Sequence, residues 1–289
     1  MTADELVALF DLAPAGEDRF VGYSALNGWR RVYGGQVLAQ ALVAAERAVA
    51  GRDPHSLHAY FLLGGDPHEP ILFEVERLRD GRSFTTRRVV ARQKGEAIFV
   101  MVASFHAQEP GFDHAAPPPA APAPEACPDR RQAIDLLKGP ARLHMKGMLD
   151  MTWPIDIRPT DLTRYAAGAV REPRSTLWTR IGEPLPPDPA IHRAALLYLS
   201  DMSLLETALG AHGVSAHDPH IQIASLDHAL WFHRPTRVDD WLLYVQDSPN
   251  AVGATGLVRG LIYTRDGMLV ASVAQEGLMR RRQDAELLG

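Results

Sequence analysis

The chain has 289 residues, with 30 basic and 35 acidic side chains and a formal net charge of -5. That length is enough for one large domain or two ordinary ones around a buried core. The acidic balance argues against nucleic-acid binding. The single cysteine, Cys127, excludes an internal disulfide framework and suits a reducing compartment. The N-terminus does not read as a secretory signal, and no apolar run approaches the ~20 residues of a membrane span, so we expect a cytoplasmic protein without membrane insertion.

The first part of the chain predicts one long helix followed by four strands. A helical pattern covers residues 36–50, directly after Gly34-Gly35. The strand-like runs that follow span 55–63, 71–79, 83–93 and 97–108. Proline and alanine then dominate residues 109–128, which predicts an extended, poorly packed connector. Residues 129–174 show no regular pattern beyond a short helical stretch at 131–137.

The last part of the chain repeats the order of the first. A helix is predicted over 191–209, and strands are predicted over 221–234, 241–248, 256–265 and 268–279. The hairpin turns Lys94-Gly95 and Asp266-Gly267 hold matching places, and the strands after them share Val-Ala-Ser at 102–104 and 270–272. We therefore expect an α+β fold of two repeats, each a central helix wrapped by a curved antiparallel sheet. The repeats span 1–108 and 175–289, with a connector and irregular linker region at 109–174.

Asp201 lies in the most apolar stretch of the second predicted helix. Its neighbours three and four residues away are Leu197, Tyr198, Leu204 and Leu205. A carboxylate on such a face is buried, which is costly unless other groups hydrogen-bond to it, and buried carboxylates are common in active sites. The alternative is an aspartate that tilts towards a frayed helix end or caps a neighbouring loop.

Two further polar side chains are predicted to point towards this helix. Strict alternation along 221–234 separates the residues of the strand into two faces. One face holds Ser225, Asp227, Ala229, Trp231 and His233, and the other holds Leu226, His228, Leu230 and Phe232. In the last strand Gln275 shares a face with Leu269, Ala271 and Val273. An amide, a hydroxyl and a carboxylate could thus meet and hold a water, although Ser225 could instead bond to local backbone and Gln275 could lie at the surface.

Several sequence segments resemble those of one known family. They are RVYGGQVLAQAL (31–42), HSLHAYFLLGGD (55–66), LRDGRSF (78–84), DHALWFHRP (227–235) and LVASVAQEG (269–277). Together they resemble the acyl-CoA thioesterase II family, of TesB type, over nearly the whole chain. The resemblance weakens only in the connector and the part after it. It implies a double hotdog fold, in which two helix-plus-sheet units of one chain join edge to edge.

The resemblance also implies a catalytic trio. The family's aspartate, threonine or serine, and glutamine map onto Asp201, Ser225 and Gln275, where Ser225 replaces the more familiar threonine and lacks its rotamer-restricting methyl group. The implied reaction is hydrolysis of fatty acyl-CoA to fatty acid and coenzyme A by a water that the trio activates. No cofactor or metal is expected, because coenzyme A is part of the substrate. Backbone N–H groups at Gly34 and Gly35 could bind the substrate, at its oxyanion or at a phosphate.

Two other functions stay open. Asp53 and His58 have a spacing similar to that of the acid/base pair in hotdog enoyl-CoA hydratases, although Asp53 falls in a GRDP stretch that predicts a turn. A non-catalytic acyl-CoA-binding protein is the other, but such a protein would be expected to lose the trio. A G-x-S-x-G motif is absent from the sequence, and Cys127 lies in the connector, so neither serine-hydrolase nor cysteine chemistry is expected.

The remaining polar residues predict structural roles. The histidine pairs His55/His58 and His228/His233 face opposite sides of their strands, and His217 and His220 are expected in a solvated loop, so no zinc site is predicted. Gln36 and Gln40 are expected to pack or hydrogen-bond between the two repeats. Arg280-Arg281-Arg282 predicts a solvated terminus, with attraction of coenzyme A phosphates as the alternative. Because hotdog sheets leave pairing edges and relatives assemble through them, a homo-oligomer is expected.

Overall fold

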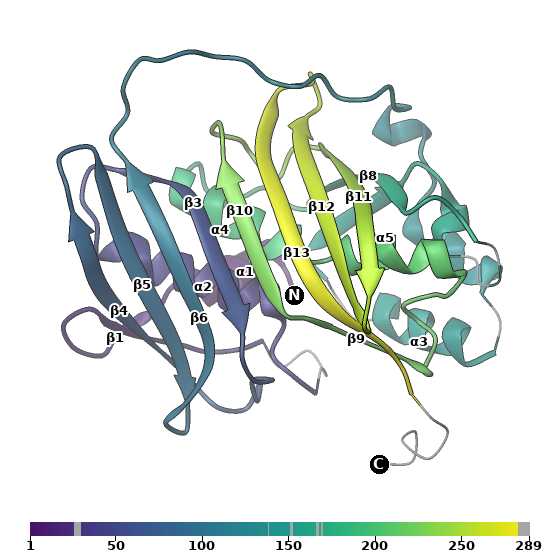
Figure 1. The fold of residues 1–289 in the computed structure, drawn as a ribbon, viewed down its shortest axis with the longest axis horizontal. Helices are drawn as coiled ribbons and strands as arrows, with labels where there is room; N and C mark the ends of the chain where they lie inside the picture. The colour runs from purple at the N-terminus through teal and green to yellow at the C-terminus, as the bar shows by residue number, and fades with distance from the viewer. Residues whose placement is uncertain (26–29, 138, 151–152, 166–167, 169, 283–289) are drawn as a thin grey trace.

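The computed structural model describes residues 1–25, 30–137, 139–150, 153–165, 168 and 170–282. In this part of the chain, thirteen strands form one sheet that curves around the helices (Figure 1). The strands follow the order β1-β2-β4-β5-β6-β3-β10-β13-β12-β11-β8-β7, and β9 pairs with β13 beside this path. The strand pairs are antiparallel, as the hairpin turns predict.

The first half of the chain supplies one central helix and one side of the sheet. A short helix, α1 (Ala3–Phe10), precedes the central helix α2 (Gly34–Arg47), most of whose residues are buried. A helix that is buried on most sides must be covered by more than one layer, which the curved sheet provides. The strands of this half are β1 (Ala13–Pro14), β2 (Arg19–Gly22), β3 (Asp53–Phe61), β4 (Ile71–Asp80), β5 (Phe84–Gln93) and β6 (Glu96–His106).

The second half repeats this arrangement with a broken helix. Its helical part consists of α4 (Pro189–Ser200), α5 (Leu204–Leu209) and the 3-10 turn η4 (Gly210–His212). The strands are β8 (Arg174–Ile181), β9 (Ile221–Ser225), β10 (Asp227–Phe232), β11 (Leu242–Val252), β12 (Thr255–Thr264) and β13 (Leu269–Arg281). The single helix predicted over 191–209 is therefore wrong, because residues 201–203 leave the helix. Serine and aspartate side chains compete for backbone hydrogen bonds and so favour such breaks.

The two halves join through strands β3 and β10 and through their helices. β3 and β10 pair antiparallel, with Leu57 opposite Leu230, so that the sheet runs on from one half to the other. Behind this seam α2 packs against α4 (Figure 1). The architecture confirms the predicted α+β double hotdog, two helix-plus-sheet units joined edge to edge.

The region between the halves contains several short elements. They are η1 (Pro124–Ala126), η2 (Arg130–Leu136), α3 (Gly139–Asp150), β7 (Ile155–Pro159) and η3 (Leu162–Tyr165). The connector passes over one end of the sheet before it reaches η1 (Figure 1). The prediction that it packs poorly throughout is wrong for its end. Trp178 Nε1 donates to the Pro122 carbonyl at 2.8 Å, and Cys127 is buried beside Trp178 and Trp241.

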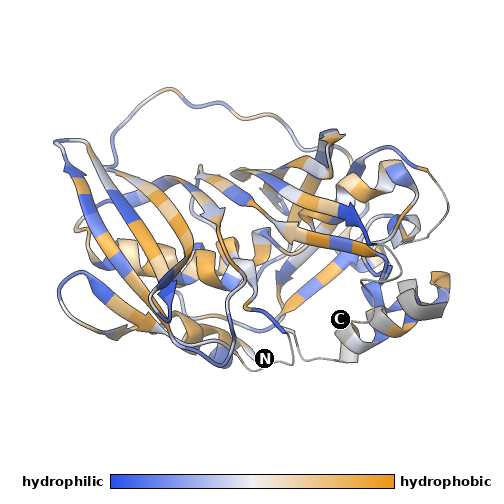
Figure 2. Cartoon of the chain, turned by 60° about the horizontal axis from the view of Figure 1, so that its bottom comes forward, coloured by the Kyte–Doolittle hydropathy of each residue, from blue (hydrophilic) through white to orange (hydrophobic). Residues whose placement is uncertain are grey.

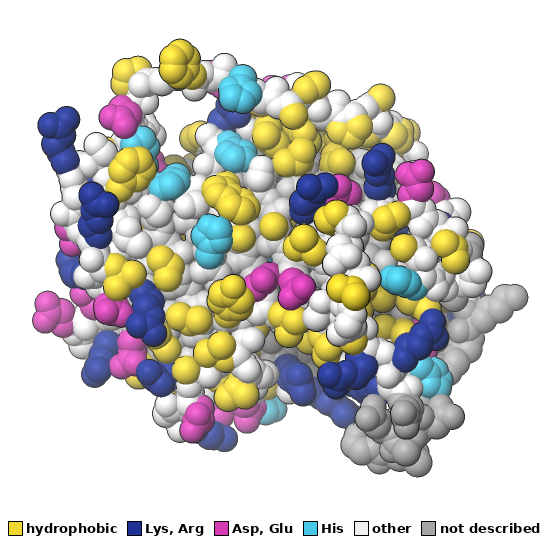
Figure 3. All heavy atoms as spheres, viewed as in Figure 1, with side chains coloured by type: hydrophobic (Ala, Val, Ile, Leu, Met, Phe, Trp, Pro, Cys, Tyr) yellow, Lys and Arg dark blue, Asp and Glu magenta, His cyan; other side chains and the backbone are white. Residues whose placement is uncertain are grey.

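The apolar core fills the space between the helices and the concave side of the sheet. Hydrophobic and hydrophilic residues alternate along the strands (Figure 2), as expected for sheets with one buried face. The convex side carries hydrophobic and histidine side chains among charged ones (Figure 3). The alternation of buried and exposed residues along β3, β5 and β6 places exposed Tyr60, Phe84 and Val102 on this side. None of the helices in the described residues has the length and apolar character needed to cross a bilayer.

Candidate active site

Asp201 lies at the C-terminal end of α4, in the break before α5. It is the C-cap residue of α4, and its side chain is half-buried rather than fully buried. The break is held by side chains of other elements: Tyr244 Oη donates to the Ser200 carbonyl at 3.0 Å, and Gln246 Nε2 donates to Ser203 Oγ at 2.7 Å. The carboxylate therefore projects from a fixed helix end.

Ser225 reaches the same place because the strand that carries it is bulged. Ser225 pairs with Gly277 and Ala229 pairs with Ala274, so four residue steps on one strand oppose three on the other. The extra residue lies around Leu226, whose N–H donates to the Glu276 carbonyl at 3.0 Å. A bulge of this kind reverses the alternation of faces after it. The predicted grouping of Ser225 with Asp227 is therefore wrong.

Gln275 points inward from β13, as predicted. Its side chain is fully buried, and the neighbouring inward residues Ala271 and Val273 belong to the core. The sequence predicted that Leu269 shares this face, and that prediction is wrong. A register shift between Ala271 and Leu269 turns Leu269 towards the outer cluster around Trp178.

The three side chains form a closed triangle of hydrogen bonds. Ser225 Oγ donates to Asp201 Oδ1 at 2.9 Å. Gln275 Nε2 donates to the same Oδ1 at 2.9 Å and to Ser225 Oγ at 2.5 Å. The partners that the sequence required for a carboxylate in this setting are thus present, and both of them converge on one of its two oxygens.

The second carboxylate oxygen faces the start of the first-half helix. Gly34 is the first residue of α2, and a Cβ built on it would lie 2.8 Å from Asp201 Oδ2 and 3.0 Å from the Phe61 ring. Gly35 lies even closer to α4, since a Cβ there would lie 2.5 Å from the Tyr198 carbonyl oxygen. The first-turn N–H groups of a helix have no partner within the helix and favour negative charge. The site therefore combines a carboxylate from one half with a helix N-terminus from the other.

Neutral side chains surround this carboxylate. Burial raises the pKa of the Tyr33 phenol, and the Asp201 charge raises it further. Burial and the same charge also raise the pKa of Tyr244. Burial lowers the pKa of the His228 imidazole, although Asp201 opposes that effect. These three groups stay uncharged at neutral pH, and all three lie near the Asp201 side chain.

His228 is a member of this cluster that sequence reasoning missed. Its ring is fully buried, and Nδ1 lies 3.0 Å from Gln275 Oε1. Regular alternation placed His228 on the face opposite Ser225, and only the bulge brings the two to one side. The available signal was a histidine between Leu226 and Leu230 on a predicted apolar face.

Several other polar residues have roles different from those predicted. Gln36 Nε2 and Gln40 Nε2 both donate to the Tyr23 carbonyl, so they anchor the N-terminal segment rather than the junction between repeats. His217 is buried rather than solvated. The described residues contain no group of three or more histidine, cysteine, aspartate or glutamate side chains that could hold a metal. Arg280 and Arg281 are exposed at the end of β13, as expected of a solvated terminus.

The proposed hydratase pair does not come together. Asp53 begins β3 instead of lying in a turn, and its carboxylate pairs with Arg193 Nη1 at 3.2 Å. His58 is exposed and packs edge-on against Trp231, with ring centroids 5.2 Å apart. These two side chains are engaged with different partners on different elements.

Comparison with known proteins identifies the chain's relatives. Residues 145–278 match the family model described as acyl-CoA thioesterase, and residues 25–106 match the acyl-CoA thioesterase N-terminal domain. Mouse acyl-coenzyme A thioesterase 8 is 39% identical over 95% of this chain and 88% of its own length. A crystal structure of an acyl-CoA thioesterase II, TesB2, from Mycobacterium marinum is 40% identical, covers 96% of this chain and 99% of that one, and superposes with a TM-score of 0.80.

The chain belongs to the acyl-CoA thioesterase II family. The resemblance read from the sequence words is confirmed, and the chain is an enzyme of this TesB-like family. A hot dog fold protein from Alicyclobacillus acidocaldarius, 20% identical over 96% of this chain and 99% of that one, superposes with a TM-score of 0.77 and supports the fold alone.

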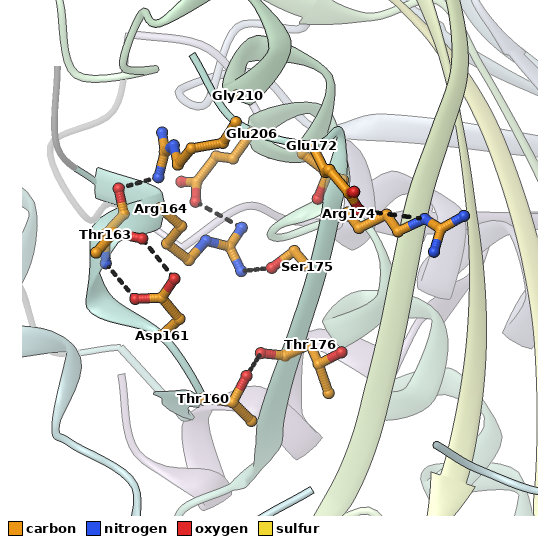
Figure 4. Close-up of a pocket in the computed structure, with 12 residues that line it drawn as sticks. Thr160, Asp161, Thr163, Arg164, Glu172, Arg174, Ser175, Thr176, Glu206 and Gly210 are labelled. Carbon is orange, nitrogen blue, oxygen red and sulfur yellow. Dashed lines mark hydrogen bonds and ion pairs between the residues drawn. The ribbon is translucent and has the colours of Figure 1, made fainter. Parts of the chain in front are cut away.

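A separate cavity of about 340 Å³ lies beside α5 in this thioesterase-family chain (Figure 4). Arg164 crosses it, with Nη1 2.6 Å from Ser175 Oγ and Nη2 3.1 Å from Glu206 Oε2. Arg174 lies at its rim, 4.0 Å from the Glu172 carboxylate. Arg164 and Arg174 thus have acidic neighbours, and no member of the triangle lines the cavity.

Proposed function

We propose that this chain hydrolyses fatty acyl-CoA thioesters to free fatty acid and coenzyme A, at the triangle of Asp201, Ser225 and Gln275. The observation that carries the proposal is the convergence of both hydrogen-bond donors on Asp201 Oδ1. This convergence fixes the carboxylate and leaves Oδ2 directed towards Gly34. A fixed carboxylate oxygen beside a helix N-terminus can serve as a general base next to an oxyanion site.

The proposed step follows from these positions. Asp201 Oδ2 removes a proton from a water as the water oxygen attacks the thioester carbonyl carbon. The C=O electron pair moves to the carbonyl oxygen, which the N–H groups of Gly34 and Gly35 stabilise. The C–S bond then breaks as the oxyanion collapses, and the proton returns from Asp201 to the thiolate of coenzyme A. Ser225 and Gln275 hold the base in place, which is the positioning part of catalysis.

The same geometry supports neither a hydratase nor a non-catalytic binding protein as well as it supports a thioesterase. A hydratase would need an acid/base pair, and Asp53 and His58 are held by Arg193 and Trp231. A non-catalytic acyl-CoA-binding protein would not need a carboxylate that Ser225 and Gln275 hold in place by hydrogen bonds.

The test is thiol release from a panel of short-, medium- and long-chain acyl-CoAs. Asp201→Asn keeps the shape of the side chain but removes the base, so kcat should fall by roughly 10²- to 10⁴-fold. Asp266→Asn is the matched control, since it makes the same change in an exposed hairpin turn where Asn-Gly is as suitable as Asp-Gly. We also propose that no metal or other cofactor takes part, so chelator should leave the wild-type rate unchanged. Near-normal turnover of Asp201→Asn would contradict the assignment.

We further propose that the chain self-associates. The convex side of the sheet exposes Tyr60, Phe84 and Val102, which is apolar surface that a second copy could cover. Sedimentation of the purified chain measures this directly, and a monomer at all concentrations would contradict it.

A further inference from the structure

His228 links the catalytic triangle to the helix that ends at Asp201. Its Nδ1 lies 3.0 Å from Gln275 Oε1, and its Nε2 lies 3.0 Å from Ser200 Oγ. Ser200 is the last residue of α4, and its hydroxyl also lies 2.9 Å from the Leu197 carbonyl oxygen. Histidine and serine are both fully buried, so each hydrogen on these atoms has to be placed among these partners.

The triangle determines which end of the Gln275 amide faces Asp201. With the amide nitrogen towards the triangle, two N–H groups and the Ser225 hydroxyl supply three donors for its three contacts. With the amide reversed, the serine hydroxyl is the single donor left for the same three contacts, and an amide oxygen lies against the carboxylate. The nitrogen must therefore face Asp201, and the amide oxygen must face His228.

An amide oxygen only accepts hydrogen bonds, so the nitrogen opposite it must carry hydrogen. That nitrogen is Nδ1 of His228. Burial lowers the pKa of this imidazole, which favours the neutral ring with one hydrogen. Nε2 then has a free lone pair, and the single hydrogen of the Ser200 hydroxyl lies between two acceptors, this nitrogen and the Leu197 carbonyl oxygen. A charged ring would donate from both nitrogens, so Nδ1 carries hydrogen in either state.

We propose that His228 is a positioning residue, which holds the Gln275 amide in the one orientation that donates to Asp201 and Ser225. This inference rests on the proposed function of the triangle and extends it to His228 and to Ser200, the second hydrogen-bond partner of the ring. The amide of glutamine can otherwise rotate by half a turn at little steric cost, because its oxygen and nitrogen have nearly the same size. A reversed amide would turn an acceptor towards the base and disturb its alignment.

Two substitutions of similar shape distinguish the effect of the N–H donor at position 228 from the effect of side-chain volume. Asparagine at position 228 carries an N–H₂ group on Cγ, near the place of Nδ1, whereas leucine carries methyl groups on the same atom. For His228→Leu we expect kcat to fall by roughly 100-fold with KM little changed, because the base is misaligned rather than the substrate lost. For His228→Asn we expect kcat within about tenfold of wild type. Equal kcat values in the two variants, whether high or low, would overturn the proposal.

A measurement on the unaltered protein gives a second readout. The ¹⁵N chemical shifts of the imidazole distinguish a nitrogen that carries hydrogen from one that does not. We expect Nδ1 of His228 to carry hydrogen and Nε2 to lack it, and expect Ser200→Ala to keep the hydrogen on Nδ1, because the Gln275 oxygen requires a donor there. An unprotonated Nδ1 in the wild type would overturn the proposal. This readout does not depend on turnover, so it separates a failure of this inference from a failure of the thioesterase proposal.

Discussion

Alanine at position 34 would press a methyl group against the Asp201 carboxylate. The Cβ would lie 2.8 Å from Asp201 Oδ2 and 3.0 Å from Phe61, whereas ordinary van der Waals contact begins at 3.4 Å. The oxygen must therefore move by about 0.6 Å, while Oδ1 is held by two hydrogen bonds of 2.9 Å. Since a misplacement of about 1 Å can cost a factor of 100 in rate, we expect Gly34→Ala to lower kcat by roughly 10- to 100-fold. That range corresponds to about 1.4–2.7 kcal/mol of activation free energy.

Thiol release under saturating acyl-CoA measures this loss, and thermal unfolding checks that the fold is intact. Gly111→Ala is the control, because no heavy atom lies within 4 Å of its added Cβ. Gly35→Ala offers a contrast, since its Cβ would lie 2.5 Å from the Tyr198 backbone oxygen and should cost roughly 1–3 kcal/mol of folding free energy by overpacking. A stable Gly34→Ala enzyme with kcat within twofold of wild type would refute the reasoning.

Two further predictions concern the hydroxyl and a second carboxylate. Ser225→Thr keeps the donor to Asp201 and should stay within about threefold of the wild-type kcat, whereas Ser225→Ala should lose roughly 10- to 100-fold; equal rates would contradict the role of the hydroxyl. Burial raises the pKa of Glu46 from 4.5 to about 7 despite its contact with Arg193. The stability that protonated Glu46 contributes is therefore complete below pH 4.5 and is lost as pH rises through 7, by up to about 3 kcal/mol. Urea unfolding at pH 5 and pH 8 should show this decline in wild type and a smaller one in Glu46→Gln; parallel declines would contradict it.

The sequence predicted the repeated architecture because the signals for it are local. Alternation of apolar residues along a strand and turn pairs such as Asp266-Gly267 depend on neighbours within a few positions. The break of the second helix at 201–203 was not predictable in this way. It depends on Tyr244 and Gln246, which come from a strand some forty residues later. Apolar periodicity alone continues across the break.

The sequence predicted that a carboxylate, a hydroxyl and an amide meet, but it did not predict the geometry of their contact. The apolar neighbours of Asp201 in the sequence indicated a functional carboxylate, and the family resemblance implied Ser225 and Gln275 as its partners. The bulge near Leu226 is a matter of register between strands, and nothing in the local pattern marks it. Because a shift of one residue exchanges the two faces of a strand, the same omission concealed His228.

The two central helices contact each other at both of their ends. The start of α2 contacts the end of α4 through Gly34 and Asp201, and the end of α2 contacts α4 through Glu46 and Arg193. Each junction thus contains a carboxylate. At the second junction the Arg193 guanidinium lies 2.7 Å from Glu46, whereas at the first a glycine lies next to Oδ2. The shared Val-Ala-Ser phrase also places Ala107 in the first half where Gln275 stands in the second. The two junctions therefore differ in what lies against the carboxylate, a guanidinium in one and a glycine in the other.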